Sequence, residues 1–338
     1  MKKRGIGFAS GWQGVNYHFG HPDISTVNLE LTDDLRYRVG VAAADLGQGV
    51  PETLAAILSE VFGGVPSGQI EFVAPDTAVT PDGGATGASR HTAITGNATL
   101  LAAQRLAEVL KVAASEMLDT PPSEVVIREG KFFGRGGSAV TLADVVKECR
   151  RIGLPLAVTG RFVAPPTEPL DERGQGYGVN DFGYATYIAE VEVDTETGEV
   201  EVLRLAAFVD AGRIVRRMGA EMQVEGGAAM ALGFTLSEEF KQHKGWPQTD
   251  SFATYLIPTV YDVPLEISSA FVDQPVPVGD LGAKGMAELV LVPVAPAVIN
   301  AIHDAVGVRV TELPATPERV LMAIRAQEIA RDADGQDG

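Results

Sequence analysis

The sequence predicts an α+β fold made of two mixed subdomains, and two kinds of pattern support this expectation. Strand-like segments that alternate apolar and polar residues are joined by short turns, which is typical of antiparallel hairpins. Segments with a helical apolar period lie between these hairpins, so a wholly parallel sheet is disfavoured. The chain has 338 residues, of which 45% are hydrophobic, so it can bury a large core, and its length favours two domains.

The first hairpin is expected over residues 27–41, where apolar and polar residues alternate on either side of a turn at Asp33 and Asp34. A helix is then expected from Pro51, which suits a first helical turn, to the glycines at 63–64. The loop before this helix therefore points at a helix N-terminus, where free N–H groups favour an anion.

Further elements follow a long polar loop at residues 80–97. An alanine- and leucine-rich helix is expected over about 98–118, then a hairpin over 125–133 and a short helix capped by Thr141. Cys149 lies on the apolar face of that short helix and is expected in the core. Long loops inside compact domains are usually functional, so the polar loop at residues 80–97 is a candidate site.

Residues 160–182 are rich in proline, glycine and charge, and they are interpreted as the boundary between the subdomains. The first subdomain is assigned to 1–165, the linker to 166–182 and the second subdomain to 183–330. Residues 331–338 are expected to fray.

In the second subdomain, strands are expected over 184–193 and 200–209. Helices are expected over about 216–232, from Pro296 onward and from Thr316 onward. No repeat of 20–50 residues is evident.

The charge and the cysteine content exclude several classes of protein. The 27 basic and 45 acidic residues leave a net charge of −18, which argues against a nucleic-acid-binding protein and a polybasic membrane-surface protein. One cysteine excludes a disulfide framework, a cysteine-ligated zinc site and an iron–sulfur cluster held by this chain alone. Neither a signal peptide nor an apolar run of about 18 residues is recognised, so a cytoplasmic protein is expected.

Common catalytic and nucleotide-binding motifs are missing. There is no phosphate-loop motif and no nucleophile elbow, and the glycines near the N-terminus lack the spacing of a dinucleotide fingerprint. His18 and His21 lie near Asp23, but they lack a third well-spaced ligand, so a hydrogen-bonded or surface role is favoured over a metal site. No metal-ligating residue is predicted.

Three segments that contain glycine remain as site candidates. Asp45–Gly49 places an amide side chain before a helix, although an ordinary turn would have the same residues. Gly87–Thr92 collects polar donors before a helix, although a solvated loop would do so too. Gly282–Glu288 has small residues that would let a ligand approach the backbone, and its carboxylate precedes the apolar run 289–294. A carboxylate in that position is a candidate for proton transfer.

Together these segments resemble the molybdenum hydroxylases, the family of xanthine dehydrogenase and aldehyde oxidase. The matching stretches are Asp45–Pro66, Gly84–Ala98, Met222–Glu239 and Gly282–Val320, in the order found in that family. The resemblance covers about residues 5–325 and corresponds to the C-terminal half of the family's molybdopterin-binding subunit. It implies a pair of mixed α/β subdomains of the molybdopterin-binding domain.

The resemblance also implies roles for particular residues. The residues expected to bind the cofactor are Gly47, Gln48, Gly49, Ala88, Ser89, Arg90, His91, Thr92, Gln223, Lys284 and Gly285. Ala88 and Gln223 would approach the molybdenum, and Glu288 would be the catalytic base. Ala287 and Met222 stand where the family commonly has glycine, and both changes are expected to narrow the pocket.

The activity and the partners are implied in the same way. The chain would be the medium molybdopterin subunit of a split enzyme similar to nicotinate dehydrogenase, with molybdenum in molybdopterin, expected in its cytosine dinucleotide form. A large subunit would supply the N-terminal half, and further subunits would carry iron–sulfur clusters and FAD. Such an enzyme would use water to hydroxylate an electron-poor carbon of an N-heteroaromatic or aldehyde substrate. The alternative is a non-catalytic scaffold subunit with the same fold.

Overall fold

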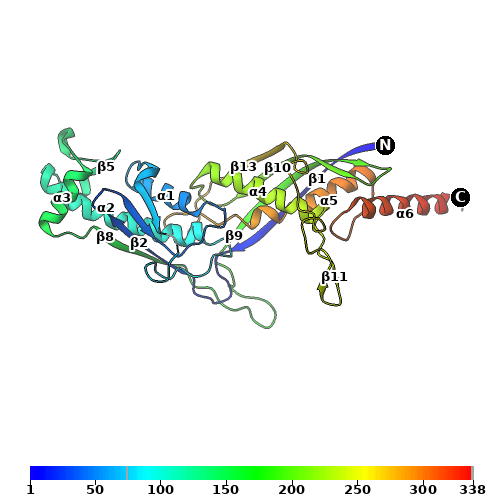
Figure 1. Ribbon diagram of the computed structural model, residues 1–338, viewed down its shortest axis with the longest axis horizontal. Coiled ribbons are helices and arrows are strands. Elements are labelled where there is room, and N and C mark those ends of the chain that lie inside the picture. Colours follow the sequence, from blue (N-terminus) through cyan, green and yellow to red (C-terminus); the bar gives the residue numbers. More distant parts are fainter. Residues whose placement is uncertain (74, 336–338) are drawn as a thin grey trace.

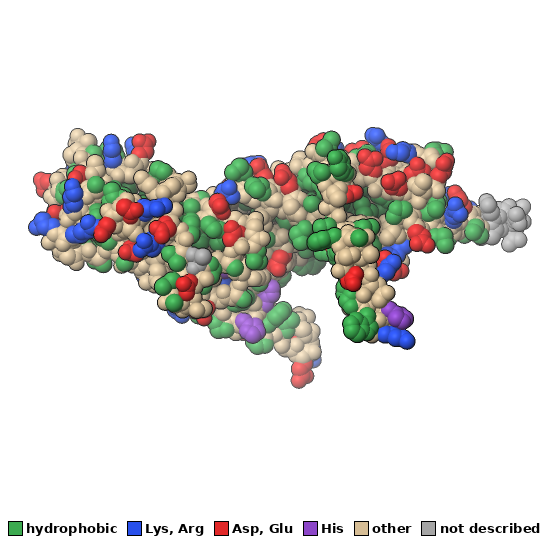
Figure 2. Space-filling model, in the orientation of Figure 1, with side chains coloured by type: hydrophobic (Ala, Val, Ile, Leu, Met, Phe, Trp, Pro, Cys, Tyr) green, Lys and Arg blue, Asp and Glu red, His purple; other side chains and the backbone are tan. Residues whose placement is uncertain are grey.

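The computed structural model shows an elongated molecule with two four-stranded sheets, one in each half (Figure 1). The structure describes residues 1–73 and 75–335, and the sheets are counted over that part of the chain. The N-terminus and the C-terminal helix both lie in the half that carries the second sheet. A space-filling view shows the same outline, from which the hairpin of β11 (Gln242–His243) and β12 (Trp246–Pro247) projects (Figure 2).

The predicted α+β class is correct, and the expected hairpins and helices are present in both halves. The first half contains β2 (Ile24–Leu31), β3 (Tyr37–Gly40), α1 (Val50–Val61), β4 (Ile70–Val73), a π-helical turn (His91–Thr95), α2 (Gly96–Leu118), β5 (Val126–Arg128), β6 (Lys131–Phe133), β7 (Ala139–Thr141), α3 (Leu142–Ile152) and β8 (Ala157–Val163). The second half contains β1 (Lys2–Val15), β9 (Asp181–Asp194), β10 (Val200–Asp210), α4 (Arg217–Leu236), β13 (Glu266–Val272), α5 (Val294–Val306) and α6 (Pro317–Gly335).

The two large sheets share one strand plan. Each has a central antiparallel hairpin, β2–β3 in the first sheet and β9–β10 in the second. The chain leaves each hairpin through a helix, α1 or α4, and returns as a strand parallel to the second strand of the hairpin, β4 or β13. The opposite edge is an antiparallel strand, β8 or β1. This structural repeat leaves no sequence period, because one edge strand follows its hairpin whereas the other precedes it.

Glycines in the edge strands let a helix pack directly on each sheet. A Cβ at Gly160 in β8 would lie 2.1 Å from the carbonyl oxygen of Ala98 in α2. A Cβ at Gly7 in β1 would lie 2.2 Å from the backbone nitrogen of Ala301 in α5. No other residue tolerates such an approach, so these glycines are required for the contact between helix and sheet.

Strand β1 corrects the predicted domain boundary. The sequence pattern assigns residues 1–165 to the first subdomain, but Lys2–Val15 pairs with β9 along its whole length and belongs to the second sheet. The glycines of β1 interrupt the alternation of apolar residues, and its partner strand follows much later in the chain. No local signal therefore marks this segment as a strand of the second half.

The predicted linker and tail also differ from the structure. Strand β9 begins at Asp181, inside the segment 166–182 that is predicted as a linker. Helix α6 runs to Gly335, so residues 331–335 of the predicted frayed tail are helical, whereas 336–338 lie outside the described residues.

Short-range predictions for helix α3 are confirmed. Thr141 caps the helix, and its hydroxyl and the Asp144 carboxylate form a reciprocal capping box. Cys149 is fully buried in the first core, and burial raises the pKa of its thiol. This cysteine therefore belongs to the packing of the first half.

The segment Leu289–Val306 is an apolar run of 18 residues, which the sequence pattern was not expected to contain. Its 18 residues have a mean hydropathy of 1.7, which is enough by length and composition for a membrane-spanning helix. The segment ends in α5, which packs against β1 and β9 with its apolar face in the second core. A helix in this position is apolar because it is part of a core.

Candidate active site

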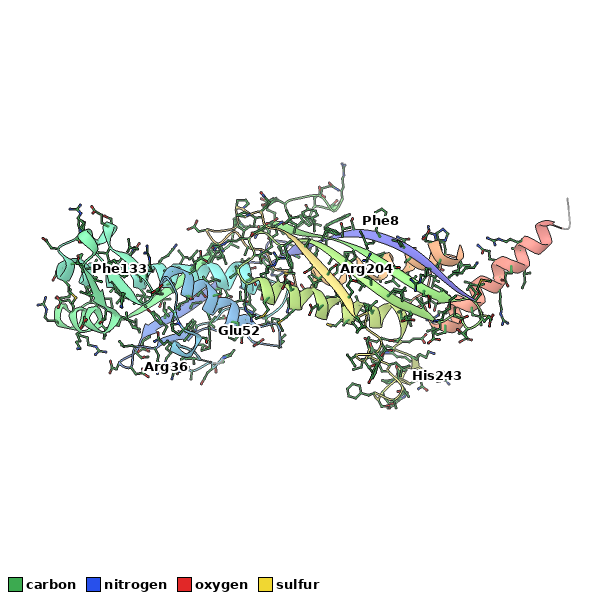
Figure 3. All side chains as sticks on the ribbon, turned by 90° about the horizontal axis from the view of Figure 1, so that it is seen from above. Phe8, Arg36, Glu52, Phe133, Arg204 and His243 are labelled. Atoms are coloured by element: carbon green, nitrogen blue, oxygen red, sulfur yellow. The ribbon has the colours of Figure 1, made fainter. Side chains whose placement is uncertain are left out.

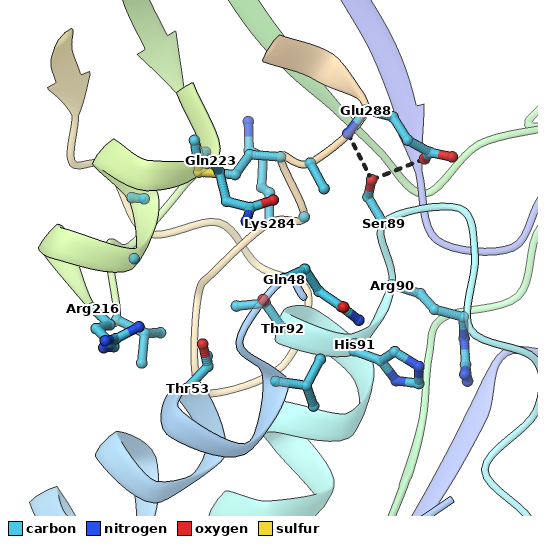
Figure 4. Close-up of a pocket in the computed structure, with 18 of the residues that line it drawn as sticks. Gln48, Thr53, Ser89, Arg90, His91, Thr92, Arg216, Gln223, Lys284 and Glu288 are labelled. Carbon is cyan, nitrogen blue, oxygen red and sulfur yellow. Dashed lines mark hydrogen bonds between the residues drawn. The ribbon is translucent and has the colours of Figure 1, made fainter. Parts of the chain in front are cut away.

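A cavity of about 360 Å³ lies where the two halves meet, and the halves contribute equivalent segments to it (Figure 4). The N-terminal ends of α1 and α4 line the cavity, as do the segments that lead toward α2 and α5. Its lining residues are Leu46, Gln48, Val50, Thr53, Thr86, Gly87, Ser89, Arg90, His91, Thr92, Ala211, Arg213, Ile214, Val215, Arg216, Gly219, Ala220, Gln223, Lys284, Gly285, Met286, Ala287 and Glu288. The segments singled out in the sequence therefore converge on one place.

Glu288 lies at the edge of the cavity and is held by two side-chain donors. Its Oε2 accepts a hydrogen bond from the Ser89 hydroxyl at 2.8 Å and another from Nε2 of Gln13 at 3.1 Å. The Ser89 oxygen in turn accepts the backbone N–H of Glu288 at 3.2 Å. Within the described residues Oε1 of Glu288 has no hydrogen-bond partner, and the side chain is exposed. The carboxylate is thus oriented through one oxygen while the other is available to a ligand.

The loop that carries Ser89 has a strained backbone. Ala88 and Ser89 have positive φ angles of 52° and 48°, in a region that residues with a side chain rarely adopt. The carbonyl of Ala88 accepts the N–H of Asn16 at 2.9 Å. A Cβ at Gly285 would lie 1.5 Å from the Ser89 carbonyl oxygen, so glycine at this position lets the two segments meet. This contact brings Ser89 next to Glu288.

His91 is a neutral, buried side chain in the lining of the cavity. Its Nε2 lies 2.8 Å from the Thr86 hydroxyl and its Nδ1 lies 2.9 Å from the Thr95 hydroxyl. Burial lowers the pKa of His91 from 6.5 to about 4, and the neighbouring Arg90 guanidinium adds to this effect. His91 therefore positions the loop through hydrogen bonds and contributes no positive charge at neutral pH.

Arg90 and Lys284 line the cavity, but the protein itself uses their charged groups. Arg90 is fully buried, its guanidinium pairs with Asp23 at 2.6 Å, and it also donates to backbone carbonyls. Nζ of Lys284 lies 3.1 Å from Oδ2 of Asp210 and donates to a backbone carbonyl at 2.8 Å. That both cations bind the cofactor stays a prediction, and in this structure each of them is already paired with a carboxylate from a distant segment. Their charges join segments of the protein.

The Gln48 loop is also closed by internal hydrogen bonds. Nε2 of Gln48 donates to the Ala44 carbonyl at 2.9 Å, and its Oε1 accepts a backbone N–H within the loop at 2.5 Å. The N–H groups of Gly47 and Gly49 both donate to Oδ1 of Asp45, at 3.0 and 3.1 Å. Asp45 thus already accepts the N–H groups of both glycines, and their contact with a cofactor stays a prediction. The Gln48 side chain lines the cavity.

Helix α4 presents one face to the cavity. Arg216, Gly219, Ala220 and Gln223 line it at the spacing of three and four residues that places side chains on one side of a helix. The side chains of Arg216 and Gln223 make no hydrogen bond within residues 1–73 and 75–335. Figure 4 shows Gln223 and Gln48 projecting into the same space from opposite halves of the molecule.

Most of the predicted site residues lie at this cavity. Those that line it are Gln48, Ser89, Arg90, His91, Thr92, Gln223, Lys284, Gly285 and Glu288. Gly47, Gly49 and Ala88 lie beside lining residues but do not line the cavity themselves. Ala287 lines it, whereas Met222 is exposed and does not, so the expectation that Met222 narrows the pocket is wrong.

Sequence reasoning missed Gln13, Thr53 and Arg216. Gln13 lies in the unrecognised strand β1, so no pattern connected it with Glu288. Arg216 stands seven residues before Gln223, and this helical spacing could have identified it. In the described part of the chain no group of three or more His, Cys, Asp or Glu is arranged to hold a metal ion, and Asp23 is paired with Arg90.

Comparison with known proteins gives the family. The family model described as the molybdopterin cofactor-binding domain matches residues 1–264. The aldehyde oxidoreductase of Megalodesulfovibrio gigas is 31% identical over 330 residues, which are 96% of this chain and 33% of that protein. A probable xanthine dehydrogenase subunit of Bacillus subtilis (strain 168) is 32% identical over 323 residues, which are 95% of this chain and 42% of that protein.

The fold gives the same result. The structure superimposes on the quinoline 2-oxidoreductase of Pseudomonas putida 86 with a TM-score of 0.79 and 27% identity, over 96% of this chain and 42% of that chain. The chain thus spans less than half the length of these relatives. The matched family region contains Gln48, Ser89 and Gln223 from the cavity. The chain belongs to the molybdenum hydroxylase family, of which it is a molybdopterin cofactor-binding domain.

Proposed function

We propose that this chain forms part of the active site of a molybdenum-dependent oxidoreductase that uses water to hydroxylate an electron-poor carbon. The observation that carries the proposal is the oriented carboxylate of Glu288 at the edge of a largely apolar cavity between two halves. The names of the relatives favour an aldehyde or an N-heteroaromatic substrate, since one is an aldehyde oxidoreductase and another is named for quinoline.

The cavity has the size and the polar groups to hold molybdopterin. Its volume of about 360 Å³ lies within the usual range of ligand pockets, roughly 300–1,000 Å³. Ser89, Thr92, Gln48 and Gln223 would hold the cofactor, because their hydroxyl and amide groups match the polar edges of a pterin. The bound molybdenum would supply the redox chemistry and the Lewis acidity of the reaction.

The residues of this chain would orient the reactants and move a proton. Glu288 accepts the proton at Oε1, the oxygen that has no partner within the described residues. Ser89 and Gln13 hold Oε2, so the accepting oxygen keeps one direction. The neutral His91 adds no charge that would compete for this carboxylate.

A second polypeptide region would complete the site. Glu288 is exposed in this chain, whereas active sites of this kind gain from exclusion of water. The chain covers 33% of one relative and 42% of another, and the latter is named as a subunit. We assign the missing part to a large molybdopterin subunit that contacts this chain beside Glu288.

The open face of the second sheet fits that partner. One side of the sheet lies under α5, and the other exposes Phe8, Trp12, Tyr184, Ile188 and Phe208, with exposed fractions from 39% to 68%. Phe8 pairs with Ile188 and Trp12 pairs with Tyr184 across neighbouring strands, and the bonded hydroxyls of Ser10 and Thr186 lie between these two apolar pairs. Figure 3 shows Phe8 on the edge strand β1. A cluster of exposed aromatic and aliphatic side chains around a small polar centre is typical of a protein interface.

The location of this face supports the assignment. Trp12 is the immediate neighbour of Gln13, whose side chain donates to Glu288. Because successive residues of a strand point to opposite faces, a polypeptide that covers the Trp12 face would reach Gln13 and the cavity by passing around the edge strand β1. Iron–sulfur clusters and FAD would be carried by further subunits, since this chain has one cysteine. The cofactor is expected in its cytosine dinucleotide form and the complex in the cytoplasm.

Affinity purification of the chain from its native host tests this proposal. Mass spectrometry of the co-purifying proteins, together with analysis for molybdenum, iron and flavin, should find a second molybdopterin subunit and all three components. Isolation of a folded chain without molybdenum or partners would contradict the proposal. Partners without molybdenum would favour the alternative, a non-catalytic scaffold subunit.

A further inference from the structure

The arginine and lysine side chains that line the cavity differ in whether an acidic side chain neutralises them. In the described part of the chain, all but one of the lining arginine and lysine side chains have a carboxylate within 4.0 Å. The neutralised pairs are Arg90 with Asp23 at 2.6 Å, Arg213 with Glu60 at 2.6 Å, and Lys284 with Asp210 at 3.1 Å. The remaining cation is Arg216.

Arg216 is partly buried at the start of α4 and has no ion-pair or side-chain hydrogen-bond partner within residues 1–73 and 75–335. Its Nη1 lies 3.7 Å from the position that a Cβ at Gly49 would occupy, so the guanidinium reaches across to the N-terminal end of α1. The Glu52 carboxylate lies near the same glycine but makes no ion pair with Arg216. A guanidinium that is partly withdrawn from water without a counter-ion loses hydration that an anion would compensate.

Arg216 and Glu288 lie on opposite sides of the lining (Figure 4). A ligand that reacts beside Glu288 therefore extends toward Arg216. The planar guanidinium binds phosphate and carboxylate groups through paired N–H donors. We propose that Arg216 binds an oxyanion of the ligand that fills this cavity, and that it is the residue of this chain that recognises that group.

The identity of the ligand that carries the oxyanion rests on the proposed function. Two sources are compatible with that function. The oxyanion is either a phosphate of the molybdopterin cofactor or a carboxylate of the substrate. Both sources place the same chemistry against Arg216, and they are distinguished by what a substitution changes. If the oxyanion is a cofactor phosphate, retention of the cofactor depends on Arg216. If it is a substrate carboxylate, the KM for the substrate depends on Arg216.

The first test measures binding of inorganic pyrophosphate to the full chain by calorimetry, for the wild type and for Arg216→Gln. The substitution should weaken binding at least about tenfold, the loss expected for a hydrogen bond to a charged group. Arg216→Lys should restore part of it. Arg217→Gln is the matched control, because Arg217 is exposed, pairs with Glu221 and does not line the cavity. Equal affinity of the wild type and Arg216→Gln, or no binding by the wild type, would overturn the proposal.

The second test uses the purified complex and separates the sources. Loss of molybdenum and pterin per chain in Arg216→Gln, but not in Arg217→Gln, assigns the oxyanion to the cofactor. Unchanged molybdenum with a KM for nicotinate that rises relative to an uncharged analogue assigns it to the substrate. If the chain holds no molybdenum but pyrophosphate binding depends on Arg216, the proposed function fails and the anion site stands.

Discussion

The two sheets of this molecule have the same strand plan, but large apolar side chains are much more prominent on the open face of the second. The open face of the first sheet is polar, with Arg38 bonded to Glu30 and Glu71, and Thr159 bonded to Asn28. The corresponding face of the second sheet has ion pairs only toward one end, such as Arg4 with Glu192, and elsewhere exposes apolar side chains that include Phe8 and Trp12. Because the plan is shared, the difference does not follow from the fold. Under the proposed function, solvent covers the first face and the partner subunit covers the second.

The two halves also differ at the cavity that they share. The polar groups of the first half, such as Arg90 and His91, are bonded within the protein and hold loops in place. In the second half, Glu288 is exposed and Arg216 has no partner within the described residues. Under the proposed function, the first half therefore offers uncharged groups such as Gln48 and Ser89 to the cofactor, whereas the second half offers the charged groups of Glu288 and Arg216.

Replacement of Glu288 by Gln tests this division most strongly. The amide cannot accept the proton, so turnover of the purified complex should fall by about 10²- to 10⁴-fold, the range for removal of a general base. Molybdenum content should stay at the wild-type level, because cofactor retention depends on other residues. Ser89→Ala in the first half should cost much less activity. Equal losses in both variants would show that the halves do not divide the work in this way.

Arg90→Met should have the largest effect on stability. It leaves Asp23 buried without its partner, a change that costs about 3–5 kcal/mol. Arg216→Met serves as the control, since it breaks no ion pair within the described residues and should cost less than about 1 kcal/mol. Urea unfolding of the full chain measures both, and a larger loss in the Arg216 variant would contradict the comparison.

Trp12→Ser addresses the open faces of the sheets. It should weaken association with the co-purifying molybdopterin subunit by about 2 kcal/mol, roughly 30-fold in Kd, as is typical of an interface hot spot. Val163→Ser, on the exposed side of β8 in the first sheet, removes an apolar side chain that is 49% exposed and should leave Kd unchanged. Surface plasmon resonance with the immobilised partner measures both constants. The assignment of the interface fails if the two variants bind alike.

The smallest expected effect is the pH dependence that His91 contributes to stability. The unfolded chain binds the proton with a pKa near 6.5 and the folded chain with a pKa of about 4, so the unfolded state holds more protons between these values. Acidification from pH 6.5 to 4 should therefore lower the free energy of unfolding, by at most about 1.4 kcal/mol per pH unit from this group. His91→Gln should remove that part of the slope in urea titrations at several pH values. An unchanged slope would show that the histidine is not buried in its neutral form.

The hairpins and helices were predictable because their signals are local. Apolar alternation marks β2 and β3, and the capping pair Thr141 and Asp144 marks the start of α3. The candidate site was predictable where its residues, such as Gln48, Ser89 and Glu288, lie in glycine-containing motifs. Strand β1 was not predictable, since its glycines serve a contact with α5 that no neighbouring residue announces.

The sequence by itself determined the α+β class and the secondary structure around the motifs, and it predicted Gln48, Ser89, Gln223 and Glu288, which the fold brings to one cavity. Only the tertiary structure decided which of the polar groups are available to a ligand. Asp23 neutralises Arg90 and Asp210 neutralises Lys284, whereas Arg216 has no such partner in the described chain. The physical reason is that the balance of charge at a site depends on groups that lie far apart in the sequence and meet only when the halves pack together.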